Sequence, residues 1–205
     1  LTEVTISGNV ADEGGGIYLS YSNPTLTEVT LSGNVADKGG GIYLSNANPT
    51  LTNVTFSGNE ASDGGVIYLN NSDPTLTNSI IWNNIPESIY LFSGNEQAII
   101  TYSDIEGGWE GEGNIDVDPL FANPENGDYT LQPDSPCIDA GTAVFEWEGD
   151  TLINMSANEY YGSAPDMGAY EYGVVYGCID ITADNYNAEA SIDDGSCEYL
   201  VLIET

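Results

Sequence analysis

The sequence predicts an all-β fold, a parallel β-helix (solenoid) of about 25 residues per rung, followed by a different, Cys-bounded module. Residues 1–25, 26–50 and 51–75 are copies of one sequence with no insertion between them, and a fourth copy begins at Leu76. Within each copy apolar residues alternate with polar ones, and Gly-, Asn- or Pro-rich segments separate the alternating stretches. A fixed period in the twenties is typical of solenoids, whose coils stack on one another.

The strands of each rung are predicted from a period of two. In the first copy Val4, Ile6, Ile17 and Leu19 occupy alternate positions, which is the pattern of strands with one buried face. The turn-forming segments of that copy are residues 7–9, 14–16 and 22–24. Short strands between such turns make one rung of a parallel β-helix, and the repeat shows no helical spacing.

Successive rungs should lie about 4.8 Å apart, so that each residue stacks on its equivalent in the next copy. We expect three apolar interior columns, made of Val4, Val29 and Val54, of Ile6, Leu31 and Phe56, and of Leu19, Leu44 and Leu69. On the opposite face we expect an exterior aromatic stack of Tyr18, Tyr43 and Tyr68. Beside a turn we expect an amide ladder along the axis, formed by Asn9, Asn34, Asn59 and Asn84.

After the fourth copy the repeat loosens, and we expect irregular terminal rungs and loops over residues 85–173. Within this region, residues 129–131 and 169–172 alternate like short strands. Phe145 and Trp147 are expected to anchor a long loop over residues 142–163.

Three blocks of this region are specific in combination: DPLF at 118–121, GDYTLQPDSPCIDAG at 127–141 and DMGAYEY at 166–172. Together with the repeats they resemble secreted bacterial right-handed parallel β-helix surface proteins, which are pectin-lyase-like in fold and carry a choice-of-anchor type C-terminal region. The resemblance covers nearly all of residues 1–173. It implies a right-handed parallel β-helix and export from the cell, and it implies no particular activity.

Residues 176–199 are similar to a short Cys-bounded module of secreted proteins, GCxDxxAxNYNxxAxxDDGSCxY. This resemblance implies a disulfide between Cys178 and Cys197, and hence a small disulfide-closed C-terminal module. A disulfide agrees with an oxidising compartment outside the cytoplasm. Three cysteines allow three pairings, and the one left over, Cys137, is expected to be a small buried residue.

The loop between these cysteines is rich in hard oxygen donors, namely Asp180, Asp184, Asn185, Asn187, Asp193 and Asp194. Oxygen donors in a small acidic loop suit Ca²⁺, which makes Ca²⁺ the candidate cofactor of this chain. Their spacing does not match an EF-hand loop. The alternative interpretation is that these residues are turn formers.

Charge excludes several classes of function. Thirty-three acidic residues face one Lys and no Arg or His, which gives a net charge of −32. Binding to nucleic acid needs cationic contacts to phosphate, and an anionic membrane surface would repel such a chain. The sequence also has no apolar run of about 18 residues that would span a bilayer. This charge fits an environment in which salt screens it, and Glu3 stacked on Glu28 should be repulsive at low salt.

The composition also argues against catalysis. Polysaccharide lyases, which share the β-helix architecture, use a cationic base and cationic help for the charge of the substrate. The only cation here is Lys38, at a turn position where we expect it to be solvated. A glycosidase needs two carboxylates, but the best pair, Asp116 and Asp118, lies in an expected turn. We therefore expect no enzymatic centre in this chain.

Thr-Leu-Thr triplets at residues 25–27, 50–52 and 75–77 are similar to the TxT arrays of ice-binding solenoids. Thr is favoured on strand exteriors in general, and this interpretation accounts for the triplets.

These observations favour a non-catalytic, secreted structural or adhesive β-solenoid of the bacterial cell surface, at the C-terminal end of a longer protein. We expect the β-helix over residues 1–173, with regular rungs over 1–84, and the module with the start of a further C-terminal region over 174–205. The expected partner is an extracellular glycan, a protein or a second copy of the chain. The alternative is a carbohydrate-binding or carbohydrate-cleaving, glycoside hydrolase-like β-helix whose active rungs lie upstream.

Overall fold

The computed structural model describes residues 1–86, 89–147, 149–188, 190–193 and 196–199. The chain divides into two compact units, Leu1–Tyr172 and Gly173–Thr205. The first unit contains the repeats and the second contains the paired cysteines, and each is described by itself.

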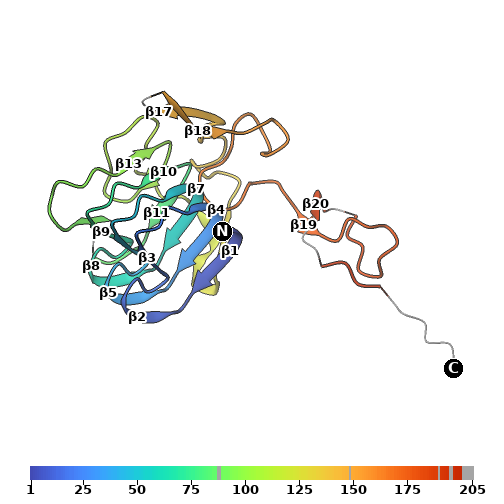
Figure 1. Cartoon of the computed structure of the whole chain (residues 1–205). Coiled ribbons are helices and arrows are strands. Elements are labelled where there is room, and N and C mark those ends of the chain that lie inside the picture. The colour runs from blue at the N-terminus through green and yellow to red at the C-terminus, as the bar shows by residue number, and fades with distance from the viewer. Residues whose placement is uncertain (87–88, 148, 189, 194–195, 200–205) are drawn as a thin grey trace. The chain divides into compact units, whose positions relative to one another are not determined.

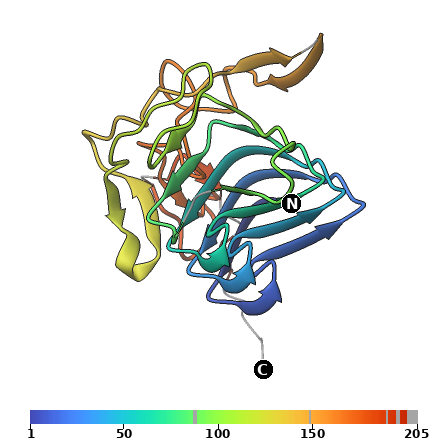
Figure 2. The same cartoon turned by 90° about the vertical axis from the view of Figure 1, so that its left-hand side faces the viewer.

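The repeats form three parallel sheets that run along the solenoid (Figures 1 and 2). The first sheet contains β1 (Thr2–Ser7), β4 (Thr25–Ser32), β7 (Thr50–Ser57), β10 (Thr75–Thr77), β11 (Ile80–Trp82), β13 (Ile99–Thr101) and β14 (Asp104–Ile105). The second contains β2 (Val10–Glu13), β5 (Val35–Lys38) and β8 (Glu60–Asp63). The third contains β3 (Ile17–Ser20), β6 (Ile42–Ser45), β9 (Ile67–Asn70) and β12 (Ile89–Leu91). In Figure 2 the strands of neighbouring rungs lie side by side from blue to green.

The register follows the repeat. Val4 pairs with Val29 and Val29 with Val54, and Leu19, Leu44 and Leu69 pair in the same way. In the inner rungs the members of all three expected columns are buried in one apolar core. The predicted fold class and the predicted interior columns are therefore confirmed.

Left-handed backbone at fixed positions turns the chain at the corners of each rung. The first sheet bends at Glu3, Glu28, Asn53 and Asn78, whose φ angles are 53°, 54°, 53° and 52°. The Gly-rich corner has a further reason for its composition. A Cβ on Gly14, which also has positive φ, would lie 2.4 Å from the Ile17 carbonyl oxygen, and one on Gly15 would lie 2.6 Å from the Gly40 oxygen of the next rung.

The expected tyrosine column is present and gains a fourth ring. Tyr18, Tyr43, Tyr68 and Tyr90 stack with ring centroids 5.1, 5.0 and 4.9 Å apart. These rings lie outside the apolar core formed by the leucines, so the two sides of the strand are assigned as expected. However, Tyr43 and Tyr68 are only 6% and 2% exposed, because their neighbours in the stack cover the ring faces. The column therefore stiffens the wall and offers few ring faces to a ligand.

Residues 117–172, here called the covering segment, do not add parallel rungs. The last parallel pairing of the solenoid among the described residues joins Asp104 to Ile115. The covering segment instead forms two antiparallel hairpins and loops, with strands β15 (Phe121–Asn123), β16 (Asp128–Leu131), β17 (Val144–Trp147) and β18 (Asp150–Asn154) and the 3₁₀ turn η1 (Pro124–Asn126).

The covering segment packs against the outer face of the first sheet. Ile81 points into the solenoid core, whereas its neighbour Ile80 belongs to a second core. That second core also contains Phe121, Tyr129, Leu131, Cys137 and Met167. The short strand expected at 129–131 is present within β16, whereas the strand expected at 169–172 is wrong. The Gly168 and Ala169 N–H groups bond instead to the Asn78 carbonyl and the Thr55 hydroxyl of the solenoid.

The expected loop anchors differ from each other. Phe145 is buried and contacts the Tyr102 ring edge-on at 6.3 Å, whereas Trp147 is 44% exposed. The second unit has little regular structure. Strands β19 (Tyr176–Gly177) and β20 (Ile192–Asp193) pair in parallel, and a disulfide joins Cys178 to Cys197. None of the helices in the described part of the chain is long and apolar enough to cross a membrane.

Candidate functional site

The expected asparagine ladder runs through four rungs. The side-chain Nδ2 of Asn9, Asn34 and Asn59 donates to Oδ1 of the next Asn at 3.0, 3.0 and 2.9 Å. Each accepting Oδ1 also accepts the backbone N–H of the preceding Asn. Nδ2 of the last three residues further donates to a main-chain carbonyl, for example from Asn59 to Leu31 at 2.9 Å. Because Asn34 and Asn59 are fully buried, the ladder satisfies polar groups that would otherwise be costly in the core.

A second ladder was not predicted. The Val54 N–H donates to Ser79 Oγ, the Ser79 N–H to Ser103 Oγ, and the Ser103 N–H to Asn114 Oδ1. The signal that would have found it is the recurrence of Ser 24 residues after Ser79, at the spacing with which β10 pairs with β13. This ladder brings the loop that contains Asn114 back onto the end of the solenoid.

Three carboxylates fold the end of the covering segment on itself. Asp166 accepts the N–H groups of Asp139 and Tyr172, and Glu171 accepts those of Asp166 and Tyr161. Asp139 accepts the N–H groups of residues 163 and 164. Burial raises the pKa of Asp166 and raises the pKa of Glu171 to about 7, while the N–H of residue 164 and then that of 163 lower the pKa of Asp139. These acids belong to the GDYTLQPDSPCIDAG and DMGAYEY blocks.

The bend residues of the first sheet meet this part of the covering segment. Asn78 exchanges two hydrogen bonds with the backbone of Thr142, from Nδ2 to the carbonyl at 2.9 Å and from the N–H to Oδ1 at 2.8 Å. One rung earlier, Asn53 Nδ2 donates to the Asp166 carbonyl at 3.0 Å, but Asn53 Oδ1 has no partner. One rung earlier again is Glu28, whose pKa is raised by burial and then by the charges of Glu3 and Glu159. The direction of this shift agrees with the expected repulsion between stacked glutamates.

A buried acid joins the solenoid to the second core. Asp104 is fully buried and accepts hydrogen bonds from the Val117 N–H at 3.1 Å and the Cys137 thiol at 3.3 Å. Burial raises the pKa of Asp104 to about 6 and also raises that of the Cys137 thiol. Cys137 is thus buried, as expected, and has a specific partner that the sequence did not reveal.

The carboxylate pair considered for glycosidase chemistry lies in turns. Asp116 and Asp118 are both exposed, and each accepts a backbone N–H, from Gly107 at 3.2 Å and from Leu120 at 2.9 Å. These geometries show two acids that hold loops, which is the local environment the sequence predicted.

The Lys38 side chain is 39% exposed, in agreement with the expected solvation, but the residue lies in a strand and not in a loop. It ends β5, forms an ion pair with Glu13 at 3.1 Å and lies 5.6 Å from the centre of the Tyr68 ring. Its column contains Glu13 and Asp63, so the single cation sits between two acids of neighbouring rungs.

The Thr-Leu-Thr triplets pair in register along the first sheet. Thr52 and Thr77 are only 9% and 1% exposed. The described residues therefore do not present a flat open Thr array of the kind that ice-binding solenoids use.

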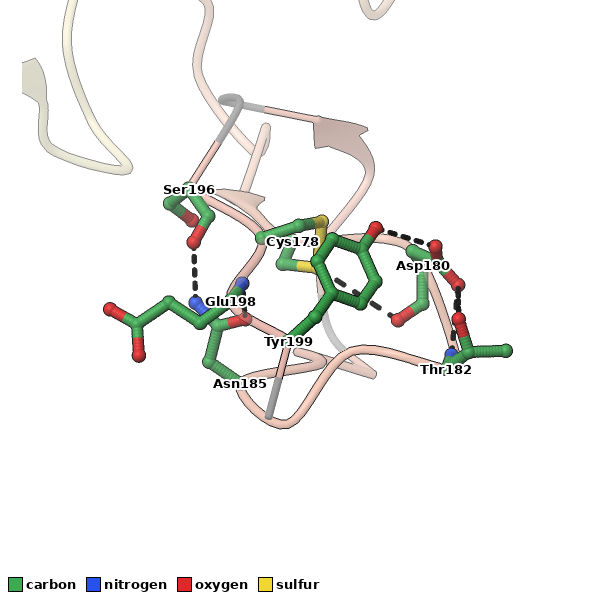
Figure 3. The surroundings of a disulfide bond; sticks show 8 residues. Cys178, Asp180, Thr182, Asn185, Ser196, Glu198 and Tyr199 are labelled. Atoms are coloured by element: carbon green, nitrogen blue, oxygen red, sulfur yellow. Dashed lines mark hydrogen bonds between the residues drawn. A yellow bond between two sulfur atoms is a disulfide. The ribbon is translucent and has the colours of Figure 1, made fainter. Parts of the chain in front are cut away.

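In the second unit, two of the candidate Ca²⁺ ligands hold turns (Figure 3). Asp180 accepts hydrogen bonds from the N–H and the hydroxyl of Thr182 and from the Tyr199 hydroxyl, at 2.8, 2.7 and 2.7 Å. Asn185 donates to the Ser196 carbonyl at 2.6 Å and accepts the Glu198 N–H at 2.7 Å. These contacts tie both sides of the Cys178–Cys197 disulfide together.

The remaining candidates contribute backbone contacts or lie outside the described residues. The Asp184 N–H donates to the Glu198 carbonyl, and the Asn187 N–H donates to the Cys178 carbonyl. Asp194 and the side chain of Asp193 are outside the described part of the chain. Among the described residues, no group of three or more His, Cys, Asp or Glu side chains is placed to hold a metal ion. Ca²⁺ binding by this module stays a prediction.

Comparison with known proteins supports the fold independently. No curated protein and no solved structure matches the chain. A family described as "Right handed beta helix region" matches residues 1–111, which is more than half of the chain. The chain belongs to this family of right-handed β-helix proteins.

Proposed function

We propose that this chain is a non-catalytic structural or adhesive β-solenoid of the bacterial cell exterior. The observation that carries the proposal is that the buried and half-buried polar side chains form hydrogen bonds within the protein. The amides of Asn34 and Asn59 bond along the axis, and Asp104, Asp166 and Glu171 bond to N–H or S–H groups that fix loops. These side chains stabilise the stacked rungs and the loops that pack on them, and this role is structural.

Location outside the cytoplasm is supported by the disulfide, since disulfides persist in oxidising compartments. It is also supported by the net charge of −32, which requires screening by salt or divalent cations. The covering segment fits the proposed role of a choice-of-anchor type region, because the acids of its specific blocks fold it on itself and its Asp166 carbonyl accepts a hydrogen bond from Asn53 of the solenoid. The second unit fits the proposed Cys-bounded module.

The proposed partner is an extracellular glycan, a surface protein or a second copy of the chain. The test is retention of the purified chain on immobilised host or algal glycans and proteins, together with its oligomeric state in solution at seawater salt. Binding or self-association without chemical change of the ligand supports the proposal.

Catalytic activity on a glycan would contradict the proposal. The chain is incubated with pectin, alginate and neutral glycans, and new reducing ends and unsaturated products are measured. We expect none above a heat-denatured sample. Turnover that is lost in Asp116→Asn or Asp118→Asn would show that the chain is an enzyme.

A further inference from the structure

A buried amide oxygen lacks a hydrogen-bond donor. Asn53 is 4% exposed, and its Oδ1 is the one buried side-chain nitrogen or oxygen without a hydrogen-bond partner in the part of the chain that the structure describes. A buried acceptor that is left unpaired is destabilising, because it has lost its hydrogen bonds to water without gaining another. The equivalent residue of the next rung, Asn78, satisfies its Oδ1 with the Thr142 N–H. No group of the described residues donates to the Asn53 oxygen, which leaves it open to a ligand from outside.

The surroundings of this oxygen are acidic. The register Val29–Val54 places Glu28 beside Asn53, about 4.8 Å away along the axis. The other end of the Asn53 amide bonds to Asp166, whose own N–H bonds to the Glu171 carboxylate at 3.0 Å. Glu28 and Glu171 interact electrostatically with each other. The Asn53 amide thus lies where the bend of the first sheet contacts the covering segment. Glu28 belongs to this bend, and Glu171 belongs to the covering segment.

The only basic side chain of the sequence does not neutralise these groups. The single Lys of the sequence is Lys38, and it pairs with Glu13 in the second sheet. Glu28 is additionally repelled by Glu3 and Glu159. An orphan carbonyl oxygen beside uncompensated carboxylates is the environment that an oxygen-seeking cation completes.

We propose that one Ca²⁺ ion binds at this corner, coordinated by Asn53 Oδ1 and by the carboxylates of Glu28 and Glu171. The two Glu171 oxygens each accept one N–H and keep lone pairs for a metal. Because the described residues contain no group of three or more acidic, His or Cys side chains that could hold a metal, the remaining ligands are main-chain carbonyls and water. Ca²⁺ accepts such mixed oxygen shells of six to eight ligands, whereas Zn²⁺ selects N and S ligands and Mg²⁺ demands strict octahedral geometry.

The site would link the solenoid to the covering segment, because its ligands come from two rungs and from the 166–171 turn. Ca²⁺ would then fasten the outer layer at the Ca²⁺ concentrations found outside cells. This site is distinct from the candidate ligands between Cys178 and Cys197, which lie in the second unit.

The test is calorimetric titration of the full chain with CaCl₂ after removal of divalent ions, at constant ionic strength and with Mg²⁺ as the screening control. We expect a Kd of about 0.1–1 mM, typical of extracellular Ca²⁺ modules, and slower hydrogen exchange over residues 139–172 when Ca²⁺ is bound. Glu28→Gln should weaken binding about tenfold, and Asn53→Asp, which tolerates the left-handed backbone, should strengthen it about tenfold by adding a ligand charge.

Matched variants separate this site from other acids. Glu60→Gln removes one exposed charge from β8 and should leave the Kd unchanged. Without Ca²⁺, Glu28→Gln should melt at a temperature equal to or above that of the wild type, because it removes repulsion, so that its loss of Ca²⁺ response cannot be attributed to unfolding. If Ca²⁺ binding is absent, matched by Mg²⁺, or unchanged in both Glu28→Gln and Asn53→Asp, the oxygen holds a buried water only and the proposal is wrong. Loss of binding in Asp180→Asn alone would place the ion in the second unit and would equally overturn the proposal.

Discussion

The rungs and the covering segment lie in one compact unit but are held by different kinds of contact. In the rungs, hydrogen bonds and ring stacks join residues 25 positions apart, as between Asn34 and Asn59. The covering segment contacts the solenoid through pairs such as Thr55 with Ala169, which are 114 residues apart. Rungs gain stability from their nearest neighbours, whereas the covering segment must close a long chain before it gains any contact. We therefore expect the rungs to order first and the covering segment to dock later.

The two regions also differ in the charge of their buried polar groups. Most polar groups buried in the rungs are neutral amides and hydroxyls, such as Asn59 and Thr55, and the buried Glu96 has a pKa lowered to about 2, whereas the contact with the covering segment buries Asp104 and Asp166, whose pKa values are raised. A neutral amide ladder does not titrate between pH 4 and 8, but a buried carboxyl does. Changes of pH between 4 and 8 should thus act mainly where the covering segment meets the solenoid and not on the asparagine ladder.

The largest effect is expected from breaking the ladder of the rungs. Asn59→Ala removes the acceptor of the Asn34 N–H, one of the two acceptors of the Asn34 Nδ2 and the side-chain donor to the Leu31 carbonyl, all inside a fully buried core. We expect a loss of about 3–5 kcal/mol in the free energy of unfolding, because several polar groups become unsatisfied together. Urea unfolding followed by circular dichroism measures it.

The control for this prediction is Asn23→Ala, which removes an acceptor from an exposed hydrogen bond to the Asn48 N–H. Its cost should stay below about 1 kcal/mol, since water replaces the lost partner. If both variants lost the same free energy of unfolding, the contribution of the ladder to stability would not depend on its burial.

The difference between the two regions also explains what the sequence could predict. In the rungs, each copy repeats the same environment, so the alternation around Val4 and Leu19 and the recurrence of Asn9 give columns, register and ladder directly. The tyrosine stack followed from the same alternation. Its burial did not, because that depends on how closely neighbouring rings stack.

The covering segment could not be placed in this way. Its contacts pair residues at irregular separations, 113 positions for Asp166 with Asn53 and 33 for Cys137 with Asp104, so no period links them. The resemblance to secreted β-helix proteins marked the blocks as specific without giving their contacts. Residues 169–172 alternate like a strand. However, the N–H groups of Ala169 and of the preceding Gly168 bond to Thr55 and Asn78 of the solenoid, and no strand ladder forms. The orphan oxygen of Asn53 is visible only once both partners are in place.

The second largest effect is a pH response at the contact between the two regions. The Asp104 carboxyl has its pKa raised from 3.8 to about 6 by burial, which the bonds from Val117 and Cys137 only partly offset. Its protonated form is thus favoured by the folded state. This contribution is fully present below pH 3.8 and is lost as the pH rises through about 6, at a cost of about 3 kcal/mol above that pH.

Asp104→Asn removes this titration, so the variant should be more stable than the wild type by about 1–3 kcal/mol at pH 8 and should lose that advantage near pH 4. Thermal unfolding of both proteins across pH 4–8 measures the difference. Asp12→Asn, at an exposed position of β2, supplies the matched change of charge and should run parallel to the wild type. A constant difference between Asp104→Asn and the wild type across this range would contradict the assignment to Asp104.

The smallest effect on the solenoid is expected from the disulfide, although its effect on the second unit is large. Cys178 and Cys197 close a loop with a sequence separation of 19, which the chain-entropy model values at about 3 kcal/mol. In the part of the second unit that the structure describes, the regular structure is the short pair β19–β20 and few residues are buried, so a reduced chain should lose most of its order there. Hydrogen exchange of the full chain, with and without a reductant, follows both units at once. We expect protection to fall over residues 174–199 and to change by less than about 0.5 kcal/mol in the rungs, since Cys137 is already a free thiol and is not altered by reduction.

Cys178→Ser should reproduce the reduced pattern without a reductant. Loss of protection across β4 and β7 would show that the two units depend on each other for stability, and unchanged protection over residues 174–199 would show that turn contacts such as Asp180 with Thr182 suffice without the disulfide.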